Sequence, residues 1–160
     1  DGTLQHGGHV YPGLVTHALL GYDGDHPGPN HMALLARECS GVTAAAAMIR
    51  RDRFLAVGGF DEAYPSNFND VDLSLRLRRA GLRNLWTPHA AWYHVESATR
   101  VPTTTDAERD RLLAQWRHEI ANDPYFNPNL EPGRSDWLER AGRSGAPPYA
   151  RDDRGRRRFS

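Results

Sequence analysis

The sequence predicts an α/β domain, because segments with helix-capping residues and an apolar stripe alternate with short apolar and aromatic segments typical of strands. The chain has 160 residues, 39% hydrophobic and 25% charged, a composition that suits a globular domain with a buried core. Twenty basic and 20 acidic residues cancel. This balance excludes a global basic field for nucleic acid or an anionic membrane. The single cysteine, Cys39, excludes an internal disulfide.

The residue pattern in the first third of the chain predicts short helices and strands separated by turns. Residues 4–6 are expected to form a strand that Gly7-Gly8 ends. Residues 21–30 are dense in Gly, Pro, Asp and Asn, which predicts a surface loop. Residues 39–49 are small and apolar, so we expect a buried strand or helix under close packing. Residues 52–57 predict a short helix, which Asp52 caps and Gly58-Gly59 ends.

Residues 69–81 fit two patterns. Apolar residues at every second position from 71 to 77 indicate a strand. Against this, Asn69 or Asp70 can cap a helix, basic residues stand in its last turn, and Gly81 supplies a stop. A helix buried on two opposite sides would show the same alternation. We therefore predict a helix.

The following residues return to strand signals. Residues 85–87 predict a strand, Pro88 breaks it, and residues 90–94 continue it with aromatic side chains. Residues 105–122 then predict a helix with Thr105 or Asp106 as its cap. Its apolar stripe consists of Leu112, Leu113, Trp116 and Ile120.

The C-terminal residues have less regular patterning. Residues 123–130 alternate Pro with aromatic and Asn residues, so we expect an irregular segment that its aromatic side chains pin across a surface. From residue 133 onward the apolar content is low, and residues 151–158 hold five Arg and two Asp. We expect this tail to be disordered.

The acidic residues Asp70 and Asp72 are the first candidates for chemistry. Residues two apart on a helix do not face each other, so they are not an obvious acid/base pair. Both suit a helix N-terminus through the macrodipole, and helix capping is the structural alternative. In the functional alternative, Asp70 is a general base with a free lone pair that faces a cleft.

Histidines supply further candidates. His94 is expected at the end of a strand, where open α/β sheets bind ligands, and Arg100 lies nearby as a positive charge for a phosphate-bearing ligand. His6 and His9, three residues apart, can share a metal if the turn cooperates. With eight histidines in the chain, their proximity is also expected by chance. The pair Asp23 and Asp25 fits a solvated turn better than a metal clamp.

Four segments resemble, in their order, the C-terminal half of family 2 glycosyltransferases with the GT-A fold. They are CSGVT to MIRR at 39–51, GGFDE at 58–62, FNDVDLSLRLRRAG at 68–81 and YHVESATR at 93–100. The resemblance is strongest to the rhamnosyltransferase-like and cell-surface polysaccharide branches. DPYFNPNL at 123–130 is similar to the end of that branch.

The resemblance implies inverting transfer of a sugar from a nucleotide-sugar donor to a hydroxyl of a saccharide or glycolipid acceptor. It implies that Asp70 is the catalytic base and that His94 helps to bind Mg²⁺ or Mn²⁺. Asn69 stands where the family usually has Glu, and Thr43 belongs to the acceptor side. Arg100 would be a charge partner of the diphosphate.

The resemblance also implies an incomplete α/β fold, the C-terminal portion of a GT-A mixed sheet with flanking helices. Residues 1–100 would be the acceptor-side part, 101–131 a C-terminal helix and wrapping segment, and 132–160 the Arg-rich tail. The donor-binding half and its metal motif are expected to be missing, so this fragment alone would be inactive. The expected location is cytoplasmic, at the inner face of the membrane.

Two other functions fit the sequence. Asn69 and the missing half suit a non-catalytic module that binds saccharide or a partner. The Arg-rich tail suits nucleic-acid binding, although Asp152 and Asp153 dilute its charge and no nucleic-acid partner is expected.

Overall fold

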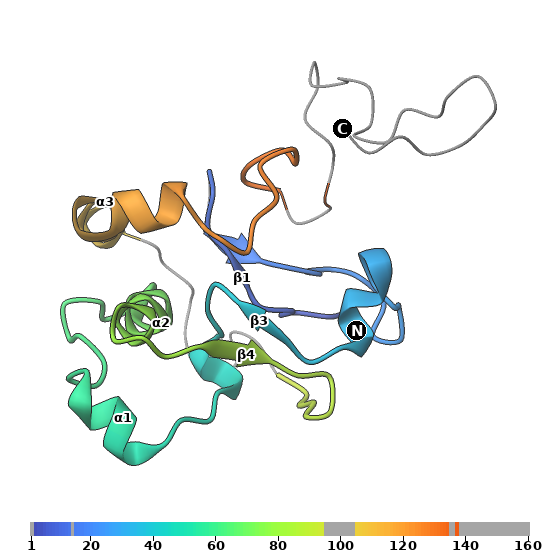
Figure 1. Cartoon of the computed structure of the whole chain (residues 1–160), viewed down its shortest axis with the longest axis horizontal. Coiled ribbons are helices and arrows are strands. Elements are labelled where there is room, and N and C mark those ends of the chain that lie inside the picture. Colours follow the sequence, from blue (N-terminus) through green and yellow to red (C-terminus); the bar gives the residue numbers. More distant parts are fainter. Residues whose placement is uncertain (1, 14, 95–104, 135–136, 138–160) are drawn as a thin grey trace.

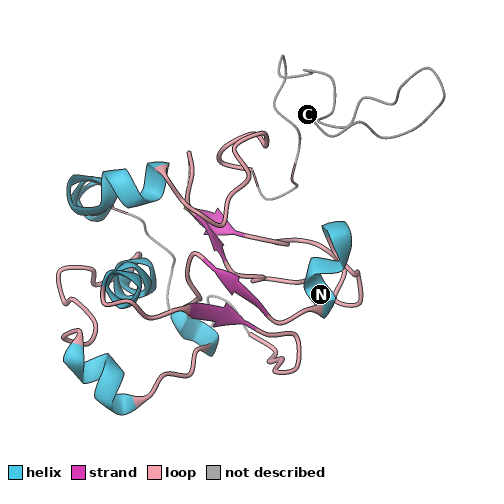
Figure 2. Cartoon of the chain, viewed as in Figure 1, coloured by secondary structure: helices cyan, strands magenta, loops and turns pink. Residues whose placement is uncertain are grey.

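A computed structural model describes residues 2–13, 15–94, 105–134 and 137. Helices and short strands alternate along these residues, which confirms the predicted mixed α/β character (Figure 2). Figure 1 shows the three α-helices on one side of the strands. The elements are β1 (His9–Val10), β2 (Thr16–His17), η1 (Pro29–Leu34), β3 (Arg37–Cys39), η2 (Ala44–Ala46), α1 (Arg51–Ala56), α2 (Asn69–Arg79), β4 (Asn84–Trp86) and α3 (Asp106–Ala121).

The strands form two antiparallel pairs. β1 pairs with β2 so that His9 lies opposite His17, and β3 pairs with β4 so that Cys39 lies opposite Asn84. The His9 amide donates to the carbonyl of Gly41 at 2.8 Å, which ties β1 to the residues after β3. The two pairs therefore lie side by side, as Figure 1 shows.

The predicted strand over residues 4–6 is wrong. Thr3 forms only an isolated bridge with Asp23, and the strand begins at His9, after the glycines that were expected to end it. Gly8 has a φ of 97°, and a Cβ there would lie 3.0 Å from the Cβ of Cys39. The chain uses this glycine to turn into β1 and to approach β3 closely.

The helices lie where the sequence predicts them, but two of their caps differ. α2 begins after Phe68, which adopts a left-handed conformation with φ 63° and gives no side-chain cap. Asp52 lies inside the first turn of α1 and pairs with Arg50, the residue at the N-cap position. α3 begins as predicted at Thr105, whose side chain forms a capping box with Glu108.

The core lies where α2 and α3 pack together. All residues from 71 to 75 of α2 are buried, which explains the alternating pattern that also suggested a strand. Leu112, Trp116 and Ile120 form the buried stripe of α3, as predicted. The core cluster is Tyr11, Tyr64, Val71, Leu75, Leu112, Trp116 and Ile120. A second cluster holds Val10, Ala18, Leu19 and Ala33, with Phe126 packed against it.

Two apolar segments are exposed, contrary to prediction. Only the start of 39–49 is buried: η2 and the residues after it face solvent, and Met48 is 96% exposed. Residues 90–94 form no strand, and Trp92 and Tyr93 are exposed. Strand propensity depends on a neighbouring strand or a buried face, and after the turn at Pro88 residues 90–94 are exposed.

Several predictions fall on residues outside the described ranges. These are Arg100 with the rest of 95–104, and nearly all of the Arg-rich tail. Within the described part of the chain, no helix has the length and apolar content needed to cross a membrane.

Candidate functional site

The first turn of α2 presents Asp70 beside the loop that follows β3. Its Oδ2 accepts a hydrogen bond from the Ala44 amide at 3.0 Å, and its Oδ1 accepts one from the Val71 amide at 2.9 Å. The side chain is 18% exposed. Two amides thus fix the carboxylate while part of it stays open to solvent.

The neighbouring candidates are Asn69 and Thr43, and each takes part in a hydrogen bond that a backbone amide donates. Oδ1 of Asn69 accepts a hydrogen bond from the Asp70 amide at 2.8 Å. The Thr43 amide donates to Nε2 of His6 at 3.1 Å, one residue before the amide that holds Asp70. The structure therefore brings Asn69, Asp70 and Thr43 together.

Three histidines lie close to Asp70. His6 precedes β1, and His9 and His17 form a directly opposed pair across β1 and β2. The ring centroids lie 4.8–5.2 Å apart, edge to face. Nε2 of His9 is 3.9 Å from Oδ2 of Asp70. This arrangement joins the trio His6, His9 and His17 to the Asp70 site.

Two of these rings are held neutral. Burial, followed by the neighbouring rings of His9 and His17, lowers the pKa of His6 to about 2. Burial and then His17 lower the pKa of His9 to about 3. A neutral imidazole has one ring nitrogen with a free lone pair, so His6 and His9 are potential hydrogen-bond acceptors or metal ligands at neutral pH.

Gly41 positions the loop that carries Thr43 and Ala44. A Cβ at this residue would lie 2.4 Å from the hydroxyl of Tyr11 and 2.7 Å from the Cβ of Ser74. The Gly41 carbonyl accepts the His9 amide. Only a residue without a side chain allows the loop to lie this close to both β1 and α2.

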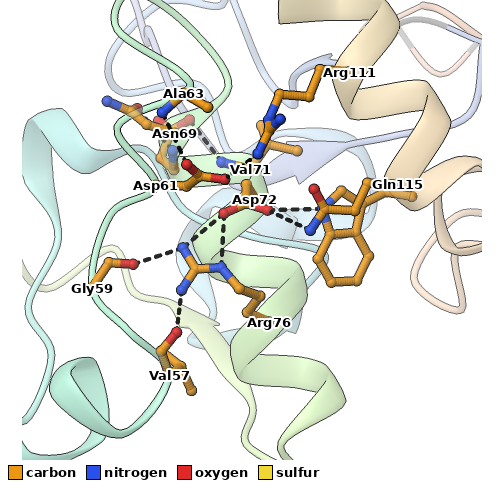
Figure 3. A network of polar contacts seen from close by, with 12 residues as sticks. Val57, Gly59, Asp61, Ala63, Asn69, Val71, Asp72, Arg76, Arg111 and Gln115 are labelled. Carbon is orange, nitrogen blue, oxygen red and sulfur yellow. Dashed lines mark hydrogen bonds and ion pairs between the residues drawn. The ribbon is translucent and has the colours of Figure 1, made fainter.

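Asp72 has a different environment from Asp70. It is fully buried, and its Oδ2 accepts from Nε of Arg76 at 2.8 Å while its Oδ1 accepts from Nε1 of Trp116 at 2.9 Å. Arg76 also donates to the carbonyls of Val57 and Gly59 (Figure 3). Asp72 therefore joins the end of α1, α2 and α3, and it is a structural residue.

His94 lies apart from the trio. It is exposed, and its Nδ1 lies 2.7 Å from Oε1 of Gln5. Among the described residues, the one group of three possible metal ligands is His6, His9 and His17, and it does not include His94. Mg²⁺ and Mn²⁺ take about six ligands, mainly oxygen, and the contact with Gln5 supplies one such oxygen beside His94. These two residues by themselves are therefore too few ligands for such a cation.

Sequence reasoning missed His17 and the structural role of Asp72. The turn dipeptide Pro12-Gly13 between two short β-prone segments could have predicted the hairpin that sets His17 opposite His9. The packing of Asp72 against α3 depends on residues more than 40 positions away. Nothing local in the sequence signals that contact.

Comparison with known proteins gives several relatives. The chain is 39% identical over 148 residues to the uncharacterized protein y4gI of Sinorhizobium fredii, covering 86% of the chain and 16% of that protein. It is 34% identical over 136 residues to the O-antigen biosynthesis protein RfbC of Myxococcus xanthus, covering 81% of the chain and 11% of that protein.

A shorter match relates the chain to a named transferase. It is 40% identical over 53 residues to an N-acetylglucosaminyl-diphospho-decaprenol L-rhamnosyltransferase of Mycobacterium tuberculosis, covering 33% of the chain and 17% of the enzyme. No family model matches the chain, and no solved structure gives a significant match. The chain spans less than a fifth of each of these relatives. The matches relate it to proteins of O-antigen synthesis and rhamnosyl transfer.

Proposed function

We propose that the chain is the acceptor-side part of an inverting family 2 glycosyltransferase domain with the GT-A fold. It would transfer a sugar from a nucleotide-sugar donor to an acceptor hydroxyl in cell-surface polysaccharide or glycolipid synthesis. The names of the relatives support this class of reaction. The observation that carries the proposal is the Asp70 carboxylate, fixed by two amides and open to solvent at the start of α2.

Asp70 would act as the general base. An inverting transfer needs one carboxylate that removes the proton of the acceptor hydroxyl while its oxygen attacks the anomeric carbon. The amides of Ala44 and Val71 each occupy one lone pair of Asp70, so the carboxylate keeps free lone pairs in a fixed orientation. The partial positive charge at the start of α2 favours a negative charge at this position.

The remaining candidates would surround the substrates. Thr43 and Asn69 flank the base and would line the acceptor side, while Arg100 would approach the diphosphate. The proposal includes Mg²⁺ or Mn²⁺, which neutralises a leaving diphosphate when bound. His94 would contribute one ligand, and oxygen ligands from outside the described residues would complete the site.

The test is a sugar-transfer assay of the full-length protein that contains this chain. Asp70→Asn keeps the size of the side chain and removes the base. We expect kcat to fall about 10²–10⁴-fold, the usual contribution of a general base. The matched control is Asp110→Asn, because the Asp110 side chain is 71% exposed on α3.

Wild-type turnover in Asp70→Asn would refute the role of Asp70. Absence of transfer by the wild-type protein, combined with saccharide binding, would instead show the non-catalytic module that the sequence also allowed. Thermal unfolding of both variants shows whether a loss of activity reflects loss of fold.

A further inference from the structure

The histidine trio has the features of a transition-metal site. His9 and His17 are opposed across a two-stranded pair, and His6 faces both from the preceding segment. One nitrogen from each ring lies within 4.8 Å of the others. The hairpin backbone fixes two of the three ligand positions, so the set is largely preformed.

The distances between donor atoms fit a shared ion. Nδ1 of His6 lies 3.2 Å from Nδ1 of His17. Two imidazole nitrogens bound to one tetrahedral Zn²⁺ at about 2.0–2.1 Å lie about 3.3 Å apart. The largest separation in the trio exceeds this by about 1.5 Å. Rotation of the half-buried His6 and His17 side chains would have to close this gap.

His9 supplies an unpartnered buried nitrogen. Its side chain is 1% exposed, and Nδ1 has no hydrogen-bond partner within the described residues. A buried polar atom without a partner is destabilising, so such an atom in a native protein calls for an explanation. Coordination of a metal through Nδ1 would satisfy this nitrogen.

The positions available to the ring protons of His6 and His17 give an independent argument for metal binding. Nδ1 of His17 lies 3.1 Å from the Gln5 carbonyl and 3.2 Å from Nδ1 of His6, while Nε2 of His6 accepts the Thr43 amide. If the proton of His6 is on Nδ1, it points at Nδ1 of His17. That nitrogen must then carry no proton, so its lone pair faces the Gln5 carbonyl oxygen. If the proton of His6 is on Nε2, this proton faces the hydrogen of the Thr43 amide. No pair of neutral tautomers satisfies every contact.

We propose that His6, His9 and His17 bind one Zn²⁺-type transition-metal ion. Three neutral imidazoles suit Zn²⁺, Co²⁺, Ni²⁺ or Cu²⁺, and not Mg²⁺ or Ca²⁺. The Gln5 carbonyl or water would complete the coordination. Binding through Nδ1 of His6 leaves the ring proton on Nε2, so the Thr43 amide must release its contact with His6. The proposal does not depend on the glycosyltransferase assignment.

The test titrates the purified, metal-free 160-residue chain with Co²⁺, which has visible absorption when tetrahedrally bound, and then displaces it with Zn²⁺. We expect one Co²⁺ per chain, displacement by Zn²⁺ and none by Mg²⁺. His17→Gln and His6→Gln should abolish the absorption bands, while His118→Gln, an exposed histidine of α3, should keep them. Amide NMR should show a shift at Thr43 on metal binding.

Circular dichroism and thermal unfolding of each metal-free variant accompany the titration. His17 is only half-buried, so His17→Gln is the variant expected to keep its fold. The proposal is overturned if the folded wild-type chain binds no Co²⁺. It is also overturned if folded His17→Gln binds Co²⁺ as the wild type does, because the ion then lies elsewhere.

Discussion

Asp70 and Asp72 stand two residues apart on one helix and have different environments. Two helical positions apart correspond to a rotation of about 200°, so the two carboxylates lie on different sides of α2. Asp70 points toward the loop after β3 and stays partly exposed, whereas Asp72 is buried against Arg76 and Trp116. The sequence predicted that they do not face each other. It did not predict which of them is buried.

Asp72→Asn should lower the free energy of unfolding by about 3 kcal/mol. Removing one partner of a buried ion pair costs about 3–5 kcal/mol, and the 20% exposure of Arg76 places the cost at the lower end. Chemical denaturation measures the loss. Asp110→Asn is the control, expected within about 0.5 kcal/mol of wild type. Equal stability of Asp72→Asn and Asp110→Asn would contradict the structural role of Asp72.

Glu108 makes stability depend on acid pH. Burial alone would raise its pKa, but the amides of Asn67 and Ser66 and the hydrogen bonds of Thr105 outweigh burial and lower the pKa to about 2. Since the unfolded value is 4.5, the ionised Glu108 stabilises the fold fully above that pH. Its contribution is lost as the pH falls from about 4.5 to about 2.

Glu108→Gln should therefore destabilise the chain by about 1–3 kcal/mol at pH 7, with a smaller difference from wild type at pH 3. Denaturation curves at several pH values measure this difference. Glu62→Gln, an exposed carboxylate, is the control and should change little at any pH. A Glu108→Gln effect that stays constant down to pH 2 would contradict the assignment.

At the scale of elements, the loop after β3 decides the geometry of the site. Residues 39–41 are buried against β1 and α2, and the chain then emerges so that the amides of Thr43 and Ala44 meet His6 and Asp70. Gly41 is the pivot because no side chain fits there. This short apolar segment thus positions the two backbone amides that donate to His6 and Asp70.

Gly41→Ala should cost about 1–3 kcal/mol, the usual cost of overpacking a core. Tyr11→Phe removes the hydroxyl nearest to the new methyl group. A double-mutant cycle should therefore show that Tyr11→Phe is less harmful, or favourable, in the Gly41→Ala background. Strict additivity of the two changes would show that the close contact with Tyr11 is not what excludes a side chain.

Helices were more predictable than strands in this chain. Both helices carry their signals locally: α2 has acidic residues in its first turn and basic residues in its last, and α3 has a capping box and an apolar stripe. The strands are two or three residues long and exist through pairing with distant partners, so their positions near residue 9 and their absence at 90–94 were not predictable from local propensity. The exposure of residues 44–49 was also not predicted, because the composition of a segment does not reveal whether other elements cover it.

The candidate site was partly predictable. Asp70 was identified from its place at a helix start and Asn69 from the family resemblance, and the structure adds the amide of Ala44 that orients the Asp70 carboxylate. The proximity of the histidine trio depends on a hairpin register that no single motif encodes. The site is therefore defined by contacts between β1, the loop after β3 and α2. No single sequence motif defines it.

At the scale of the whole molecule, this chain matches one region of much longer relatives. It spans 11–17% of the proteins that it matches, and its described residues offer a fixed carboxylate beside a group of three histidines. The proposed transfer needs a nucleotide-sugar site in addition to the residues described. We therefore expect the proposed activity in the full-length protein, where the proposed role of Asp70 can be measured.

The most direct test is the single-turnover rate of sugar transfer by full-length protein with bound donor, for wild type and Asp70→Asn. This rate reports the chemical step and not substrate binding. The account predicts a rate about 10²–10⁴-fold lower in Asp70→Asn, with donor affinity and thermal stability retained. An unchanged single-turnover rate in Asp70→Asn would contradict it.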